Sequence, residues 1–170
     1  MKKVIRKLLL PMAFFAIPCV SLVSCSGNEE PEIQPTLAEE YSGTYNGMIT
    51  LKVADQYSYQ TDISCSITAG DNETITVSFP EYSLTGTMMG DMTLGSVTMS
   101  NLVYDEAKGG FYRNYGGEGF TQTINGISYP LNDPTSIIVA KDQNGNLTIE
   151  NPFSPGKMPL ALTATFEGRK

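Results

Sequence analysis

The chain has 170 residues, with 18 Asp and Glu against 11 Lys and Arg, and it contains no histidine. The lack of histidine excludes the usual general base, the Ser-His and Cys-His nucleophile pairs, and the commonest zinc ligand. An acidic surface repels phosphate backbones, so we expect no nucleic-acid partner.

Residues 1–24 predict a secretory signal peptide. Four basic residues within the first seven precede an apolar run that Pro11 and Pro18 interrupt, which makes the run too short to span a bilayer. The run ends in Leu22-Val23-Ser24-Cys25, which resembles the lipobox of bacterial lipoproteins. Cys25 is then the first residue of the mature chain and carries acyl chains. Because each buried methylene contributes about 0.8 kcal/mol, two chains make a stable membrane anchor.

Residues 25–40 comprise the lipidated cysteine and a predicted flexible linker. Five glutamates, two prolines and few apolar groups cannot drive ordering. The signal peptide removes four of the 11 basic residues and none of the 18 acidic ones, so the mature net charge becomes 7 − 18 = −11. The pair Glu29-Glu30 resembles the acidic signal of lipoproteins that Gram-negative bacteria display on the outer membrane. We therefore expect an outer-membrane location at the cell surface, with the periplasmic face as the alternative.

The segment from residue 41 to residue 170 predicts one all-β domain. Apolar residues alternate with polar ones at a period of two, which is typical of strands that bury one face. The alternating segments are 45–53, 57–67, 75–79, 92–99, 137–139, 147–149 and 160–166. Asn144-Gly145 between two of them is a strong hairpin signal. These patterns predict a small antiparallel up-and-down β-barrel of about eight strands, with a sandwich as the alternative.

Two features favour the barrel. Between Asp91 and Met99 the inward phase skips a residue at Gly95-Ser96, which predicts a bulge or kink that curves the sheet. The first and last segments would each leave an exposed edge, and pairing them with each other removes both edges. The inward residues expected at this seam from the last segment are Leu160, Leu162, Ala164 and Phe166.

Several strings resemble the calycin-like lipoprotein domain of Gram-negative bacteria. They are Tyr41-Ser42-Gly43-Thr44-Tyr45-Asn46-Gly47, then Ile75-Thr76-Val77-Ser78-Phe79 followed by Leu94-Gly95-Ser96-Val97, and the ending Leu162-Thr163-Ala164-Thr165-Phe166-Glu167-Gly168-Arg169-Lys170. The resemblance covers residues 41–170. It implies a secreted, lipid-anchored barrel in a family whose members mostly lack an assigned activity.

The wider calycins, such as the lipocalins, have a Gly-x-Trp on the first strand, with an Arg from the last strand over the indole. Gly43-Thr44-Tyr45 matches this motif with Tyr in place of Trp, and Arg169 is placed late enough to be the partner. The resemblance implies a barrel-closing cation–π pair of Tyr45 and Arg169, worth about 0.5 to 2 kcal/mol. Its role would be structural, because the Trp is missing.

The candidate ligand-binding residues lie in the aromatic and glycine-rich stretch 111–120. Tyr112, Arg113, Tyr115 and Glu118 combine aromatic platforms with polar groups, which can stack on a sugar or another planar ligand. The alternative is a glycine-rich strand and turn whose aromatic residues alternate into the core.

Other patterns favour structural roles. Once Cys19 is cleaved off and Cys25 is acylated, Cys65 has no disulfide partner, and its alternation predicts an inert core thiol. The segment Asp142-Gln143-Asn144-Gly145-Asn146 lacks the Gly and Glu of an EF-hand and predicts a plain hairpin turn.

The methionines and the paired carboxylates also favour structural roles. A run of Met88, Met89, Met92 and Met99 suggests copper, but no Cys or His lies beside it, so we expect core packing, no metal site and no cofactor. Asp105-Glu106 and Asp71-x-Glu73 lie in turn-like stretches, whereas glycoside hydrolysis needs two carboxyls about 5 to 9 Å apart across a cleft. An enzyme is therefore the third hypothesis.

Two binding functions rank ahead of it. An interaction module would bind a glycan or an envelope protein through its loops, with a solid core. A carrier would hold a small apolar or amphipathic molecule inside the barrel, which eight strands make just wide enough. The inward side chains are mostly large, so the interaction module ranks first, and an internal void of roughly a few hundred Å³ would reverse the order.

Overall fold

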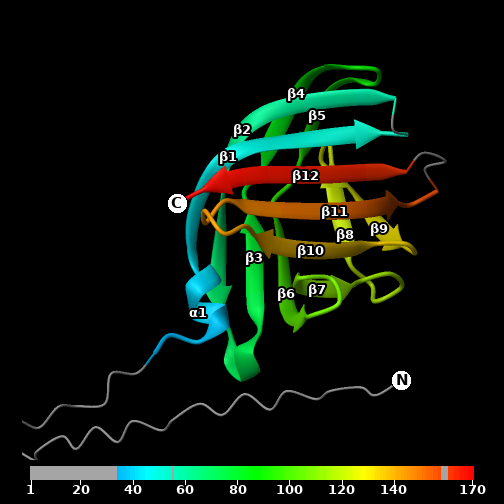
Figure 1. Ribbon diagram of the computed structural model, residues 1–170. Helices are drawn as coiled ribbons and strands as arrows, with labels where there is room; N and C mark the ends of the chain where they lie inside the picture. The colour runs from blue at the N-terminus through cyan, green and yellow to red at the C-terminus, as the bar shows by residue number, and fades with distance from the viewer. Residues whose placement is uncertain (1–33, 55, 158–160) are drawn as a thin grey trace, which may run out of the picture. The chain divides into compact units, whose positions relative to one another are not determined.

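Eight antiparallel strands close into a barrel in the computed structural model, which describes residues 34–54, 56–157 and 161–170 (Figure 1). The barrel strands are β1 (Gly43–Val53), β2 (Tyr57–Ala69), β3 (Ile75–Phe79), β6 (Val97–Asp105), β7 (Gly110–Asn114), β10 (Ser136–Lys141), β11 (Leu147–Pro155) and β12 (Leu162–Arg169). Each pairs with the next barrel strand along the chain, and β12 returns to β1. This up-and-down order confirms the predicted fold. The predicted signal peptide, Cys25 and Leu160 lie outside the described residues.

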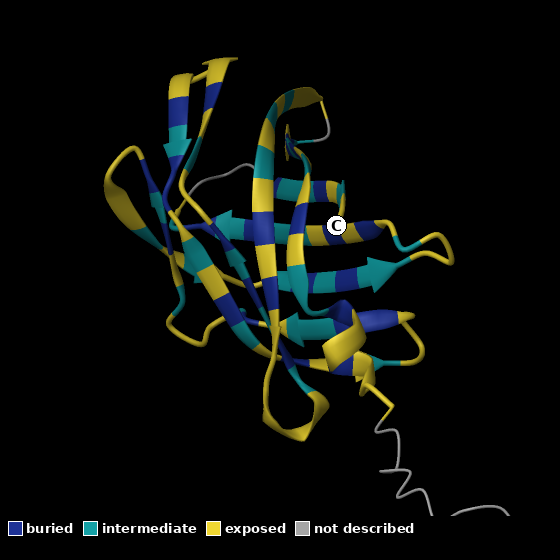
Figure 2. Cartoon of the chain, turned by 90° about the vertical axis from the view of Figure 1, so that its left-hand side faces the viewer, coloured by how far each residue is buried: buried dark blue, intermediate teal, exposed yellow. Residues whose placement is uncertain are grey.

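The seam between β1 and β12 has the predicted partners. Ile49 pairs with Phe166 and Leu51 with Ala164. Ile49 is 2% exposed and Phe166 1% exposed, so the alternation correctly identifies the face that the barrel buries. Figure 2 shows this alternation as dark blue and yellow bands along the strands.

A second, four-stranded sheet was not predicted. Its strands are β4 (Tyr82–Thr87), β5 (Gly90–Leu94), β8 (Thr121–Ile124) and β9 (Ile127–Asn132). They pair in the order β4-β5-β8-β9, and β9 joins the end of β11 through Asn132 and Ser154. The strand is interrupted at the predicted Gly95-Ser96, but the cause is a change of sheet and not a bulge, because the chain leaves β5 in the second sheet there and enters β6 in the barrel.

A short helix, α1 (Leu37–Tyr41), packs on the barrel beside the start of β1. It begins at a capping box, in which the Thr36 hydroxyl accepts from the Glu39 N–H and the Glu39 carboxylate accepts from the Thr36 N–H. Ala38 and Tyr41 are buried, and the Tyr41 ring meets Phe111 edge-on with centroids 5.0 Å apart. Residues 37–40, predicted to belong to the flexible linker, are thus part of an ordered helix. No helix in the described ranges is long and apolar enough to cross a membrane.

The apolar interior consists of two clusters. The barrel core contains Tyr41 of α1 together with inward residues of the barrel strands. The second cluster joins Leu51 and Leu162, at the far end of the seam from α1, to Leu84, Met92 and other residues of the second sheet. The second sheet therefore covers the barrel at the end opposite α1.

Glycine allows the strands to approach closely near α1. Gly47 on β1 pairs with Gly168 on β12. A Cβ atom on Gly47 would overlap the backbone of Glu167 and Gly168, so a larger residue could not occupy this position without displacing β12.

Three short turns connect β2 to β3, β6 to β7 and β10 to β11. Gly70 leads into a short 3₁₀ turn, η1 (Asp71–Glu73), between β2 and β3. Residues 106–109 connect β6 to β7, and residues 142–146 connect β10 to β11.

Candidate functional site

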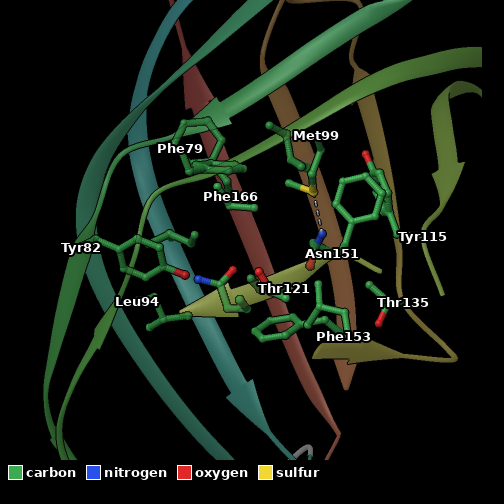
Figure 3. A pocket seen from close by; sticks show the side chains of 17 residues that line it. Phe79, Tyr82, Leu94, Met99, Tyr115, Thr121, Thr135, Asn151, Phe153 and Phe166 are labelled. Atoms are coloured by element: carbon green, nitrogen blue, oxygen red, sulfur yellow. Dashed lines mark hydrogen bonds between the residues drawn. The ribbon is translucent and has the colours of Figure 1, made fainter. Parts of the chain in front are cut away.

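A narrow cavity lies between the barrel core and the second sheet, and we call it the junction cavity. Its volume is about 40 Å³. The aromatic side chains that line it are Phe79, Tyr82, Tyr115, Phe120, Phe153 and Phe166. Figure 3 shows Tyr82 extending its hydroxyl into the cavity from one side, with the Tyr115 ring on the opposite side.

The size of the junction cavity limits what fits in it. One buried water requires roughly 10–15 Å³, and an engineered cavity that admits benzene measures roughly 150 Å³. A volume of about 40 Å³ therefore accommodates a few waters but no organic molecule of that size without side-chain movement.

Several polar groups reach the cavity wall and are bonded to the protein. Asn151 donates to the sulfur of Met99 at 3.2 Å, as the dashed line in Figure 3 marks. Gln122 donates to the carbonyl oxygen of Gly95 at 3.0 Å. These groups are amides and hydroxyls rather than carboxylates, so the cavity offers hydrogen bonds without charge.

Tyr115 contributes a polar group that is not bonded. Its side chain is 1% exposed, and its hydroxyl has no hydrogen-bond partner within the described ranges. Burial raises the pKa of Tyr115, and the Arg113 guanidinium partly offsets this. Burial likewise raises the pKa of Tyr82. An unpaired buried hydroxyl costs about 1–3 kcal/mol, so Tyr115 carries an uncompensated polar group next to the junction cavity.

Three of the four predicted ligand-binding residues come together beside this cavity. Arg113 donates to the Glu118 carboxylate at 2.6 Å and to the Ser100 carbonyl oxygen at 2.6 Å. Its guanidinium lies 5.1 Å from the centroid of the Tyr115 ring and 5.6 Å from that of Phe120. The ion pair thus holds the β7–β8 loop over the cavity wall. The role of these residues in binding a ligand stays a prediction.

Tyr112 lies apart from the other three. Its neighbours across the sheet are Val103 and Ile138, and the Lys108 ammonium sits 4.5 Å from its ring centroid. Phe111 and Tyr115, on either side along the strand, are buried. The alternative prediction, that aromatic residues of this stretch alternate into the core, is correct for these two.

Arg169 is not the cation that lies near the Tyr45 ring, so the predicted pairing of these two residues is wrong. Tyr45 is fully buried, and its hydroxyl donates to the Tyr41 carbonyl oxygen at 2.8 Å. The cation near its ring is Lys170, 5.5 Å from the centroid. Because side chains alternate along β12, residues 166, 168 and 170 share the inner phase, and Arg169 faces outward.

The structure also bears on the predictions of a buried Cys65 thiol and of turns at Asp142 and Asp105. Cys65 is 1% exposed, and burial raises the pKa of its thiol to about 12. The Asp142 carboxylate accepts from the backbone of Asn144 and Asn146, which confirms the hairpin turn. Asp105 accepts from the backbone N–H of Lys108 in the β6–β7 turn.

The methionines behave differently from the expectation. Met92 and Met99 are buried as predicted. Met88 and Met89 are each 52% exposed, so core packing is wrong for these two. They lie at the tip of the β4–β5 hairpin, outside either core.

The outer wall of the barrel also contains a broad open hollow, which we call the outer hollow. It consists of two adjoining depressions of about 590 and 510 Å³ that share Asn46, Gly47, Asp62 and Arg169. Across the sheet, Asn46 stands between Ser64 of β2 and Arg169 of β12. The hollow is polar and open to solvent, in contrast to the junction cavity.

The predicted site residues do not include Tyr82, Gln122 or Asn151, which line the junction cavity. Gln122 carried a signal, because it shares the inward phase of Ile124 and a polar residue at such a position is unusual. Tyr82 carried none, since β4 was not recognised as a strand. Among the described residues, no group of three or more His, Cys, Asp or Glu side chains is arranged to hold a metal ion.

A closed up-and-down barrel of eight strands with a filled interior defines a small β-barrel of the calycin type. The family model described as "Calycin-like beta-barrel domain" matches residues 41–169. The chain belongs to this family.

The chain is similar to the crystal structure of a putative outer membrane protein from Bacteroides fragilis. The two chains are 26% identical with a TM-score of 0.52, over 81% of this chain and 55% of that one. This chain therefore spans little more than half the length of its structural neighbour. No curated protein matches the sequence.

Proposed function

We propose that the protein is a lipid-anchored lipoprotein of the bacterial outer membrane that acts as a non-catalytic binding module. The lipobox ending at Cys25 and the acidic stretch after it support the anchor. The Bacteroides fragilis neighbour, itself proposed to be an outer membrane protein, supports the envelope location.

The filled barrel is the observation that carries the proposal. The junction cavity of about 40 Å³ lies far below the few hundred Å³ of an ordinary ligand pocket. α1 packs at one end of the barrel and the second sheet covers the other. Recognition therefore takes place on the outside of the barrel.

The outer hollow is the surface best suited to a polar ligand. Asn46, Asp62 and Arg169 project from three adjacent strands, which are spaced about 4.8 Å apart. Amide, carboxylate and guanidinium groups at such spacing offer both donors and acceptors, as a sugar with neighbouring hydroxyls requires. A surface glycan is thus the ligand class that the proposal favours.

A glycan array probed with the purified protein tests this site. Asn46→Ala and Asp62→Ala should each abolish any glycan signal of the wild-type protein. Glu150→Ala, an exposed acidic change on the outward face of β11, is the matched control and should retain it. Equal signals from all variants, or no signal from the wild type, would contradict a glycan site in the outer hollow.

The lipid anchor has its own test. Growth with a labelled fatty acid should label the wild-type protein and leave Cys25→Ala unlabelled. Label on the Cys25→Ala protein would contradict the anchor and leave the binding surface unaffected.

The unpaired Tyr115 hydroxyl favours a second candidate function, a carrier of a small amphipathic molecule in the junction cavity. Rearrangement of the loop that Arg113 and Glu118 hold would have to enlarge the cavity first. A fluorescent apolar probe, N-phenyl-1-naphthylamine, distinguishes the two functions. The carrier predicts saturable one-to-one enhancement that Tyr115→Ala changes, whereas the interaction module predicts none.

A further inference from the structure

Three methionines of the β4–β5 hairpin, two at its tip and one on β5, line the same small void. Met88, Met89 and Met92 all line a single small void of about 10 Å³, together with Val53, Tyr59 and Leu162. The lining is apolar apart from Tyr59 and Thr87, and no described Asp, Glu or Cys takes part in it. The hairpin thus places three thioether-bearing residues around a space of atomic size.

Burial does not explain two of these methionines. Met92 is 2% exposed and belongs to the cluster beneath the second sheet. Met88 and Met89 are 52% exposed each, side by side at a hairpin tip. A methionine loses much rotamer freedom when it is fixed, and two half-exposed ones gain little apolar burial to offset that loss.

The backbone nevertheless holds both residues in place. The Met88 N–H donates to the Tyr59 hydroxyl at 2.9 Å, which ties the hairpin tip to β2. The Met89 N–H donates to the Thr87 hydroxyl at 3.2 Å. Gly90 follows with a φ of +86°, a conformation that glycine adopts without strain. The two exposed thioethers are therefore carried on an ordered turn rather than a free loop.

The chemistry of thioethers selects one class of ligand. They are soft, uncharged donors that favour Cu(I), whereas Ca²⁺, Mg²⁺ and Mn²⁺ prefer oxygen ligands. We propose that Met88, Met89 and Met92 form a binding site for a soft monovalent metal cation, Cu(I), for which Ag(I) is a redox-inert substitute. The full sequence has a formal net charge of −7, which attracts such a cation.

The absence of a titratable proton on the thioether gives the site a distinctive property. Binding to Cys or His falls as the ligand is protonated. Binding to three thioethers should not change between pH 5 and pH 7. The proposal does not depend on the glycan site or on the lipid anchor.

Titration of the protein purified in detergent with silver nitrate, in chloride-free buffer, tests the proposal by native mass spectrometry. The wild type should bind one Ag(I) per chain at both pH 5 and pH 7. Met88→Leu, Met89→Leu and Met92→Leu should each lose this adduct. Leucine conserves the volume of methionine, so an unchanged urea midpoint shows that each variant is folded.

Met48→Leu is the matched control. Met48 is 39% exposed on the outer wall of β1, and it does not line the void. It should retain the adduct. One Ag(I) retained by all three hairpin variants, for example on the Cys65 thiol, would overturn the proposal, as would a wild type that binds none or a loss of equal size in Met48→Leu.

Discussion

Phe166 in the last strand provides a direct test of barrel closure. Its side chain is 1% exposed, and β12 is hydrogen-bonded to β1 on one side and β11 on the other. Its ring meets Phe79 edge-on with centroids 5.8 Å apart. We predict that Phe166→Ala strongly destabilises the domain.

The magnitude is the sum of three contributions. Returning a buried phenylalanine side chain to water costs about 1.5–3 kcal/mol. Loss of the edge-to-face pair with Phe79 adds about 0.5–1.5 kcal/mol. A void remains next to the existing junction cavity, because paired strands on both sides of Phe166 resist collapse. The total is about 3–5 kcal/mol, in the range of measured Phe→Ala substitutions.

Urea unfolding followed by circular dichroism measures this change. With an m-value of about 2 kcal/mol per M, a loss of 4 kcal/mol lowers the midpoint by about 2 M. Thr165→Ala is the control, because Thr165 is the neighbour on the outward phase and should cost under about 1 kcal/mol. Equal midpoints for the two variants would refute both the inward phase of β12 and the closed seam.

The remaining predictions concern the close approach of β1 and β12 at Gly47, the buried Cys65 thiol, and the ion pair of Arg113 and Glu118. Gly47→Ala places a Cβ against the backbone of Glu167, so it should lower the urea midpoint by at least 1 M, and an unchanged midpoint would contradict the close approach of β1 and β12. Cys65 should react with Ellman's reagent at pH 8 only in the urea-unfolded protein. Because burial raises its folded pKa from 9.0 to about 12, its contribution to stability is complete below pH 9 and is lost as the pH rises toward 12; fast native reaction at pH 8 would contradict this. Glu118→Gln removes a partly exposed ion pair with Arg113 and should cost about 1 kcal/mol or less, less still in 1 M NaCl, and a salt-independent loss of several kcal/mol would contradict a surface pair.

The barrel could be predicted from the sequence because each barrel strand buries one face in the apolar interior and turns the other outward. Period-two alternation in residues 45–53 and 162–166 then identifies both the strands and the edges that must pair. The closed seam of Ile49 with Phe166 follows from this pattern.

The second sheet could not be predicted because it buries its apolar face against a second cluster. From Met92 to Met99 the chain passes from one cluster to the other, and both accept the same apolar side chains. A bulge within one strand and a change from one sheet to another both produce the same break in the apolar alternation at Gly95-Ser96. Only long-range pairing, such as Leu94 with Ile124, distinguishes the two.

Some residues of the candidate site could be predicted from the sequence and others could not. Tyr115, Arg113 and Glu118 could be selected because aromatic and charged residues cluster within one short stretch, and they do meet in space. Asn151 and Tyr82 reach the same cavity from distant segments, so no local pattern marks them. The outward direction of Arg169 follows from the same period of two that places Phe166 inward, so the alternation itself argues against a pair of Arg169 with Tyr45.

The intact mass of the protein tests at once the proposed lipid anchor and the filled interior of the barrel. The protein is extracted from the envelope in mild detergent, and its intact mass is compared under native and denaturing conditions. A lipid-anchored barrel with a filled interior should have the mass of the polypeptide from Cys25 to Lys170 plus its acyl groups, and this mass should be the same in both conditions. An unmodified polypeptide, or an organic molecule released only on denaturation, would contradict it.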